Sequence, residues 1–286
     1  MRFGTRLYGT EPAAILAKAT KAEELGFDSI WRGDHLILPA QAASPYPHAV
    51  DGGLPFPVDA PILDVLTVLA WIAQATSRIR LATGILVLPL REPVAVARAV
   101  QTLDILSGGR AILGVGSGWL AEEFTLVGAD FASRGVATEE GIDLIKALWT
   151  QAEPTFAGRL RSVEAARFEP KPVQRPHPPI VVGGESETAL RRAARLCDGW
   201  YGHRPTPADA AAKVTCLRQL LREAGRDRSP FEITVRVLPD VSRDDVRRYD
   251  EAGVDRLVAE IGRFEDTAAL EDVETMERFA ERVMSG

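Results

Sequence analysis

The chain contains very little cysteine, and its cysteines are not arranged to bind a metal or to form a disulfide scaffold. Only Cys197 and Cys216 are present, without a C-x-x-C motif or histidine-rich spacing. Zinc sites need clustered Cys and His ligands, and small secreted scaffolds need several paired cysteines. The sequence therefore predicts neither, and we expect no metal site.

The chain also lacks an excess of positive charge and a long apolar segment. Its 34 Lys and Arg residues are outnumbered by 40 Asp and Glu residues, for a net charge of −6. A nucleic-acid surface needs a clustered basic excess, so no nucleic-acid partner is expected. The longest strongly apolar run, Val65 to Ala73, is well below the ~18 residues that span a bilayer, and the first residues contain no apolar signal core. We expect a cytoplasmic protein with no membrane partner.

Short apolar segments alternate with amphipathic ones, as a parallel sheet with crossover helices requires. We expect strands at residues 2–8, 28–33, 79–85, 110–115, 179–183, 199–202, 233–238 and 255–259. We expect helices at residues 12–25, 62–75, 93–106, 120–127, 138–150, 185–196, 207–224, 242–252 and 266–284. Eight strand–helix units in a chain near the ~250 residues typical of the (β/α)₈ TIM barrel predict that α/β fold, as a single domain over residues 1–286 with insertion loops at 41–60 and 154–178.

The carboxyl ends of barrel strands carry the functional groups of this fold. In this chain they carry Asp34-His35, Thr83-Gly84, Gly116-Ser117-Gly118, Gly183-Gly184-Glu185-Ser186, His203, Arg236 and Glu260. The glycines leave no Cβ between the backbone and a ligand, which favours a planar, polar ligand lying across them.

Two of these strand ends predict specific chemistry. Gly183 to Ser186 lies between a strand and a helix, where free amides and the helix dipole can bind a phosphate, although a tight turn with Ser186 as N-cap explains it equally well. His35 can exchange a proton near neutral pH and Asp34 can orient it, unless both residues are structural. The neighbouring acids Glu122 and Glu123 are explained at least as well by the helix dipole as by a functional role.

Several motifs together resemble a known family, the bacterial luciferase-like monooxygenases, and within it the oxidoreductases that depend on the deazaflavin coenzyme F420. The motifs are Asp34-His35, Leu103-Asp-Ile-Leu-Ser-Gly-Gly-Arg110, Gly114-Val-Gly-Ser-Gly-Trp119, Phe131-Ala-Ser-Arg-Gly135, Pro170-Lys-Pro-Val-Gln174, Val182-Gly-Gly184 and Cys197-Asp-Gly-Trp200. They occur in the family's order and spacing as far as about residue 202, and the last third matches only as further barrel repeats.

The resemblance implies a flavin-like ring at the carboxyl ends of the strands, beside a bulge that often contains a non-prolyl cis peptide. The matching bond is Gly84-Ile85, and the phosphate loop falls on Gly183, Gly184 and Glu185. Further cofactor contacts fall near Asp34, His35, Thr83, Ser117 and Gly118. Sugar-phosphate dehydrogenases of the superfamily use a glutamate just after the strand-four glycines. Trp119 stands there, so their substrate is not carried over.

Three functions follow as hypotheses. The first is an F420-dependent oxidoreductase that moves a hydride between the deazaflavin C5 and a small organic substrate, with His35 as the acid–base group and Asp34 assisting. The second is an FMN-dependent monooxygenase; the acidic tail of F420 would favour the first, if Arg32, Arg91 and Arg134 line its exit. The third is a barrel that binds a flavin or metabolite without catalysis. The resemblance also makes a homodimer plausible.

Overall fold

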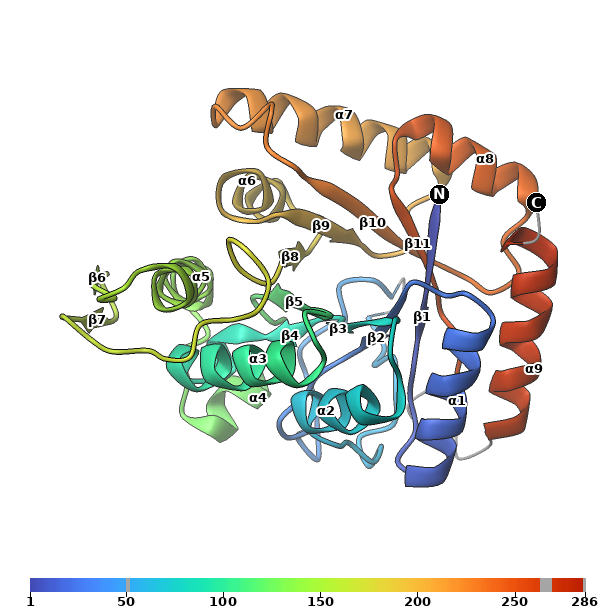
Figure 1. Ribbon diagram of the computed structural model, residues 1–286, viewed down its shortest axis with the longest axis horizontal. Helices are drawn as coiled ribbons and strands as arrows, with labels where there is room; N and C mark the ends of the chain where they lie inside the picture. Colours follow the sequence, from blue (N-terminus) through green and yellow to red (C-terminus); the bar gives the residue numbers. More distant parts are fainter. Residues whose placement is uncertain (50–51, 263–268, 285–286) are drawn as a thin grey trace.

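The computed structural model describes residues 1–49, 52–262 and 269–284, which form a closed parallel barrel (Figure 1). The barrel strands are β1 (Arg2–Arg6), β2 (Ser29–Arg32), β3 (Arg80–Thr83), β5 (Ala111–Gly116), β8 (Ile180–Gly183), β9 (Gly199–Gly202), β10 (Glu232–Val237) and β11 (Arg256–Ala259). Pairing runs around the ring in sequence order, and the contacts of β1 with β11 and of β3 with β5 close it. The eight-stranded (β/α)₈ barrel expected from the sequence is confirmed.

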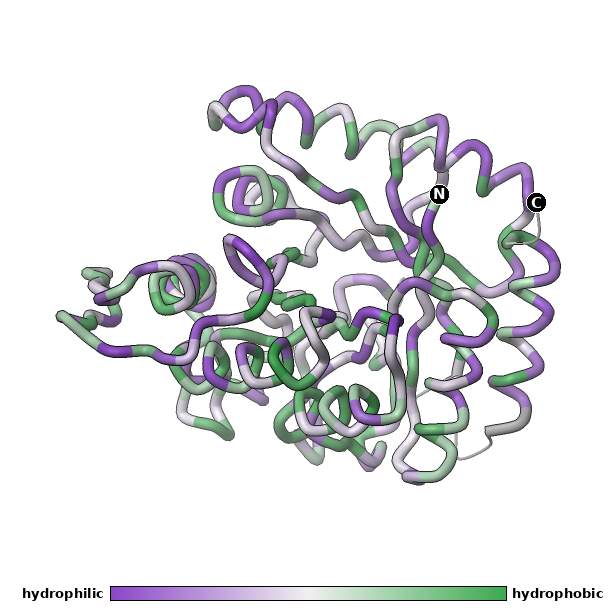
Figure 2. Tube along the Cα trace, viewed as in Figure 1, coloured by the Kyte–Doolittle hydropathy of each residue, from purple (hydrophilic) through white to green (hydrophobic). Residues whose placement is uncertain are grey.

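Helices surround the barrel on its outside. They are α1 (Pro12–Glu24), α2 (Val65–Ala75), α3 (Pro93–Leu106), α4 (Ala121–Val127), α5 (Arg134–Thr150), α6 (Glu187–Leu196), α7 (Pro207–Glu223), α8 (Arg243–Ala252) and α9 (Ala269–Phe279), which continues into a π-helix (Ala280–Met284). Hydrophobic and hydrophilic residues alternate along outer helices such as α7 and α9 (Figure 2), as one buried face requires. In the described part of the chain, no helix is both long and apolar enough to span a membrane.

Most elements begin and end within a few residues of the expected positions. α5 is the clearest difference, because it begins at Arg134 instead of at residue 138. The Asp130 carboxylate accepts hydrogen bonds from the amides of Ala132 and Ser133, and this turn starts the helix early. The segment 154–178, expected as an insertion loop, contains a short hairpin of β6 (Phe156–Ala157) and β7 (Ser162–Val163). The start of the expected last helix, residues 266–268, lies outside the described residues.

The chain closes on itself through the contact of α1 with α9, which lie side by side in Figure 1. Lys18 on α1 is buried and donates hydrogen bonds of 2.8 Å to Asp272 on α9 and to the carbonyl of Tyr8. A buried ammonium keeps its charge only when it is paired in this way. The pair therefore ties the last helix to the first strand–helix unit.

The core has two layers. The larger one lies between the sheet and the helices, and a small inner one fills the barrel. Inside the barrel, Trp31 stacks on Tyr201 with ring centroids 4.7 Å apart. Ala82, Ile112, Val181, Val258 and the partly buried Ile85 complete this inner cluster. The barrel interior is therefore packed, and ligands can reach only its ends.

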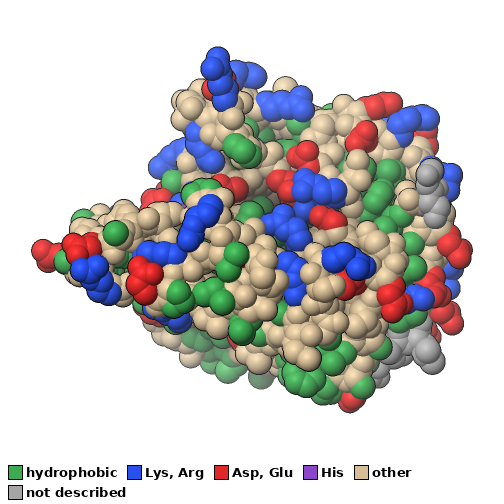
Figure 3. All heavy atoms as spheres, viewed as in Figure 1, with side chains coloured by type: hydrophobic (Ala, Val, Ile, Leu, Met, Phe, Trp, Pro, Cys, Tyr) green, Lys and Arg blue, Asp and Glu red, His purple; other side chains and the backbone are tan. Residues whose placement is uncertain are grey.

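The surface carries charges of both signs. On the face shown in Figure 3, Lys and Arg side chains lie interspersed with Asp and Glu side chains, both near the centre and along the edge. Alternating charges of this kind are typical of a solvated protein surface.

Candidate functional site

All the barrel strands are parallel, so the residues that follow them gather at one end of the barrel. We call this end the mouth. It receives the residues after each barrel strand, including every site residue expected from the sequence. Active sites of this fold lie at this end because the strand-to-helix loops meet there.

His35 and Glu123 form a buried hydrogen-bonded pair at the mouth. His35 Nδ1 lies 2.9 Å from Glu123 Oε2, and the side chains are 9% and 2% exposed. The second carboxylate oxygen accepts hydrogen bonds from the amides of Leu36 and Ile37. Because a carboxylate can only accept, Nδ1 carries the ring proton and Nε2 is the unprotonated nitrogen of the neutral ring. Glu123, in the first turn of α4, is therefore the carboxylate that orients His35.

Asp34 points to a different partner from the one that was expected. Its carboxylate binds the Arg91 guanidinium through two hydrogen bonds of 2.7 and 3.2 Å, and it also accepts from the amide of Val87. Burial raises the pKa of Asp34, although Arg91 opposes this effect. Glu123, and not Asp34, therefore forms the hydrogen bond with the His35 ring, because Asp34 is engaged by Arg91. A catalytic role for Asp34 stays a prediction.

The expected bulge follows β3, where the Gly84–Ile85 peptide bond is cis, as the family resemblance implied. Gly116 and Gly183 pack against the side chain of Ile85, a contact that the sequence did not predict. A Cβ on Gly116 would lie 2.1 Å from Ile85 Cδ1, and one on Gly183 would lie 2.8 Å from the same atom. These two glycines therefore make room for Ile85, and the cofactor contact expected of Gly183 stays a prediction. The Thr83 hydroxyl is also used inside the sheet, because it bonds the carbonyl and the amide of Gly114.

Ser117 and Gly118 follow β5. The Ser117 hydroxyl accepts a hydrogen bond of 2.9 Å from Thr138 on α5 and remains partly exposed. Gly118 has a φ of +80°, and a Cβ there would lie 2.7 Å from both Phe124 and Val87. Packing thus explains Gly118, whereas Ser117 presents a polar group at the mouth.

The turn from β8 into α6 has the features of the alternative interpretation, a tight glycine turn followed by Ser186 as the N-cap. Gly184 has a φ of +123°, and the Ser186 hydroxyl accepts from the amide of Ala189 as the N-cap. Glu185 turns its carboxylate towards Lys213, which lies 3.8 Å from Oε2 and also donates to the Glu185 carbonyl. The lysine offsets the negative charge of Glu185, and a phosphate bound at the amides of this turn stays a prediction.

A group of charged residues lies at the ends of β1, β9, β10 and β11. Arg236 Nη2 lies 2.5 Å from Glu260 Oε1, and Arg6 Nη1 lies 3.7 Å from the same oxygen. Arg204 binds the other Glu260 oxygen at 2.6 Å. Burial acts to raise the pKa of Glu260, but the arginines outweigh it and hold this pKa at about 2. Burial, together with Arg236 at 2.9 Å, lowers the pKa of His203 to about 2.

The described parts of the insertion loop, residues 41–49 and 52–60, include side chains that contact residues of the mouth. The Tyr46 ring lies 5.1 Å from that of Trp119, whose ring is in turn 6.5 Å from His35. The His48 ring stacks on His203 with centroids 3.8 Å apart. Glu122 accepts hydrogen bonds from two amides of this loop. Glu122 and Glu123, adjacent in α4, thus bind the backbone amides of two nearby segments, residues 43–44 and residues 36–37.

Comparison with known proteins identifies the class. Residues 1–283 match the family model described as luciferase-like monooxygenase, and the chain belongs to this family. It is 32% identical over 290 residues to an uncharacterised protein of Mycobacterium tuberculosis, covering 100% of this chain and 99% of that one. It is also 32% identical over 232 residues to the F420-dependent glucose-6-phosphate dehydrogenase of Kineococcus radiotolerans, covering 79% of this chain and 63% of that protein. A monooxygenase from Streptomyces bottropensis shares the fold, with a TM-score of 0.79, 20% identity and 99% coverage of both chains.

The family resemblance drawn from the sequence motifs is therefore confirmed. Glu123 and Arg6 were given no role from the sequence. Glu123 could have been found only through its contact with His35, 88 positions away. Arg6 carries no sequence signal beyond its place at the end of the first strand.

Proposed function

We propose that this protein is an F420-dependent oxidoreductase that transfers a hydride between the deazaflavin C5 and a small organic substrate. The family match and the relatives named F420-dependent glucose-6-phosphate dehydrogenase support this proposal. The observation that carries it is the buried His35–Glu123 pair, which lies at the same end of the barrel as the cis bulge. Moving a hydride to or from a carbonyl or alcohol also requires a proton, and an oriented imidazole can supply or accept it.

The residues present fit a phosphate-bearing cofactor. The amides of Gly184, Glu185 and Ser186 would hold the phosphate at the start of α6, with Lys213 next to the turn. The Gly84–Ile85 bulge would lie against the ring, and the Ser117 hydroxyl would provide a polar contact. When bound, the deazaflavin supplies the hydride chemistry at C5. The protein holds and orients it.

His35 would exchange the proton through Nε2. Its Nδ1 is bound to Glu123, and the ring also contacts Phe56 edge-on at 5.0 Å. These contacts fix the ring plane before any substrate arrives. Glu123 acts as a positioning residue, because it touches the imidazole and fixes which nitrogen carries the proton.

One observation favours the FMN-dependent monooxygenase as a second candidate. The arginines expected at the exit of the acidic F420 tail are all engaged within the protein. Arg91 binds Asp34 and Asp64, Arg32 donates to the carbonyls of Leu7 and Gly9, and Arg134 lies over the Phe131 ring at 3.8 Å. FMN lacks such a tail and needs no arginine there.

The test is a titration of the protein with F420 and with FMN, each followed by cofactor fluorescence. We expect F420 to bind at micromolar protein and FMN to bind more weakly. The Gly184→Ala variant should weaken binding, because its φ of +123° disfavours a side chain and the new Cβ would lie 2.9 Å from Ala189 Cβ.

Gly225→Ala is the matched control. Gly225 also has a positive φ, of +68°, but it lies after α7 with nothing within 4 Å of a new Cβ. The Gly225→Ala variant should be less stable than the wild type but should bind the cofactor with unchanged affinity. Tight binding of FMN with no binding of F420 would refute the proposal in favour of the monooxygenase. No binding of either cofactor would refute both.

A further inference from the structure

Three hydrogen-bond donors at the mouth are buried without a partner in the described part of the chain. They are Arg6 Nε, Arg236 Nε and Tyr201 Oη. Their residues are 5%, 7% and 5% exposed and belong to three strands, β1, β10 and β9. A buried donor without an acceptor destabilises a protein, and so such groups are rare outside binding sites. These donors can be satisfied by an acceptor that comes from outside the chain.

The residues that carry the three donors lie close to one another, and two of them border the bulge. Arg6 Nη2 lies 3.4 Å from the carbonyl oxygen of Gly84. A Cβ on Gly84 would lie 3.6 Å from Tyr201 Oη. Arg6 and Arg236 both face the same oxygen of Glu260, at 3.7 and 2.5 Å. An acceptor that binds here therefore sits beside the bulge, where a substrate would meet the proposed cofactor ring.

The charges at this point are not balanced. The two buried guanidinium groups of Arg6 and Arg236 face one carboxylate, Glu260, which a third arginine, Arg204, also binds. The neighbouring His203 adds no negative charge, and Tyr201 is neutral. Among the described residues, at least one positive charge of this buried group therefore remains uncompensated. A buried charge is stable only when it is paired.

We infer that Arg6, Arg236 and Tyr201 form the subsite for a carboxylate group of the substrate, which makes the substrate a small organic acid. A carboxylate is a planar monoanion whose two oxygens accept several hydrogen bonds, and it matches one excess positive charge and three donors from different strands. The inference rests on the proposed function, since it places this acid next to the proposed cofactor. The three side chains thereby determine substrate specificity.

The first experiment measures binding to the protein without cofactor, by calorimetry at constant ionic strength. Lactate and propionate are compared with the neutral amides lactamide and propionamide. We expect saturable binding of the two carboxylates and none of the amides, because the amides bring no charge to the arginines. Equal binding of acids and amides would overturn the inference.

Tyr201→Phe provides the sharper test, because it removes only the unpartnered hydroxyl. It should weaken lactate binding about tenfold, as expected for one lost hydrogen bond to a charged acceptor. Tyr249→Phe is the matched control: its hydroxyl donates to the Pro205 carbonyl at 2.6 Å, outside the proposed subsite, and lactate affinity should not change. Unchanged affinity in Tyr201→Phe would overturn the inference. So would a larger effect on inorganic phosphate than on lactate, because the recognised group would then be a phosphate.

The F420 titration in the same preparation separates this inference from the proposed function. Binding of F420 without binding of carboxylates refutes the subsite and leaves the proposed function standing. Binding of carboxylates without F420 or FMN refutes the proposed function and also the assignment of the bound acid as substrate of a hydride transfer.

Discussion

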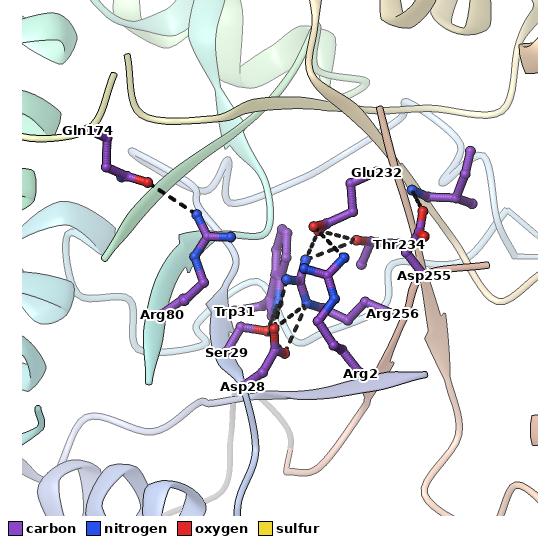
Figure 4. A network of polar contacts seen from close by, with 11 residues as sticks. Arg2, Asp28, Ser29, Trp31, Arg80, Gln174, Glu232, Thr234, Asp255 and Arg256 are labelled. Atoms are coloured by element: carbon purple, nitrogen blue, oxygen red, sulfur yellow. Dashed lines mark hydrogen bonds and ion pairs between the residues drawn. The ribbon is translucent and has the colours of Figure 1, made fainter. Parts of the chain in front are cut away.

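The two ends of the barrel bury arginines in opposite ways. At the end opposite the mouth, the side chain of Arg256 is fully buried and is held by the carboxylates of Asp28 and Glu232 (Figure 4). At the mouth, Arg6 and Arg236 are nearly as buried, yet each leaves its Nε without a partner in the described part of the chain.

Arg110, at the start of β5, lies at the same end of the barrel, which we call the closed end, and follows the same rule as Arg256. Arg110 donates to the carbonyls of Ser107, Ile79, Ala73 and Thr76, and to the Thr76 hydroxyl. Completed polar contacts stabilise a fold and leave nothing for a ligand, whereas incomplete ones can be completed by a ligand. The comparison therefore assigns stability to one end of the barrel and binding to the other, as is general for this fold.

The largest effect is expected at the closed end. Arg256→Met leaves Asp28 and Glu232 without their shared cation, so the free energy of unfolding should fall by about 3–5 kcal/mol. Urea unfolding followed by circular dichroism measures this change. The exposed pair of Arg278 with Glu274 gives the control, because Arg278→Met should change stability by less than about 0.5 kcal/mol. A loss below about 1 kcal/mol in Arg256→Met would remove the contrast between the two ends.

His35→Asn should show the opposite pattern, with a large loss of activity and a small loss of stability. Without the imidazole, the rate of F420 reduction by an accepted substrate should fall about 100-fold or more, while the F420 dissociation constant changes little. Stopped-flow absorbance measures the rate and fluorescence titration the affinity. His177→Asn, before β8 at the closed end, serves as the control. An unchanged rate in His35→Asn would favour the non-catalytic barrel or a different acid–base group.

The pH dependence of the free energy of unfolding tests the burial of one residue of the mouth, His203. The pKa of His203 is about 2 in the folded protein because the ring is desolvated and faces Arg236, against 6.5 for the ordinary side chain. Below pH 6.5 the unfolded chain binds a proton that the folded protein does not, so the free energy of unfolding falls with pH by up to about 1.4 kcal/mol per unit.

The measurement is urea unfolding of the wild type and of His203→Gln at several pH values from about 6.5 down to about 4.5. His203→Gln lacks this proton uptake, so its stability should decrease less steeply than that of the wild type as the pH falls. Parallel curves would show that His203 is not desolvated.

The smallest effect is expected for the stability of Tyr201→Phe. The Tyr201 hydroxyl has no partner in the described part of the chain, so its removal should change the free energy of unfolding by less than about 0.5 kcal/mol. Tyr249→Phe should lose about 1 kcal/mol, because it breaks a hydrogen bond. Thermal unfolding of both variants measures the difference. An equal loss in both would mean that the Tyr201 hydroxyl is already satisfied within the protein.

The sequence was sufficient for the architecture because the repeating units are local. Apolar runs bounded by Gly and Pro mark strands and helices, and eight such units can close only as a barrel of this size. The family motifs were sufficient for the cis bond at Gly84–Ile85 and for the turn at Gly184. Both lie within short segments whose residues are adjacent in the chain.

The partners of the site residues were decided only by the tertiary structure. Whether His35 is oriented by Asp34 or by Glu123 depends on how α4 packs against the end of β2, and no local pattern contains that information. The same is true of Gly116 and Gly183, whose missing side chains make room for Ile85, and of Arg6, whose neighbours lie on distant strands. The sequence by itself determined which strand ends form the mouth, because chain order fixes the order of the strands. Folding determined which side chains meet there, because those contacts join residues far apart in the chain.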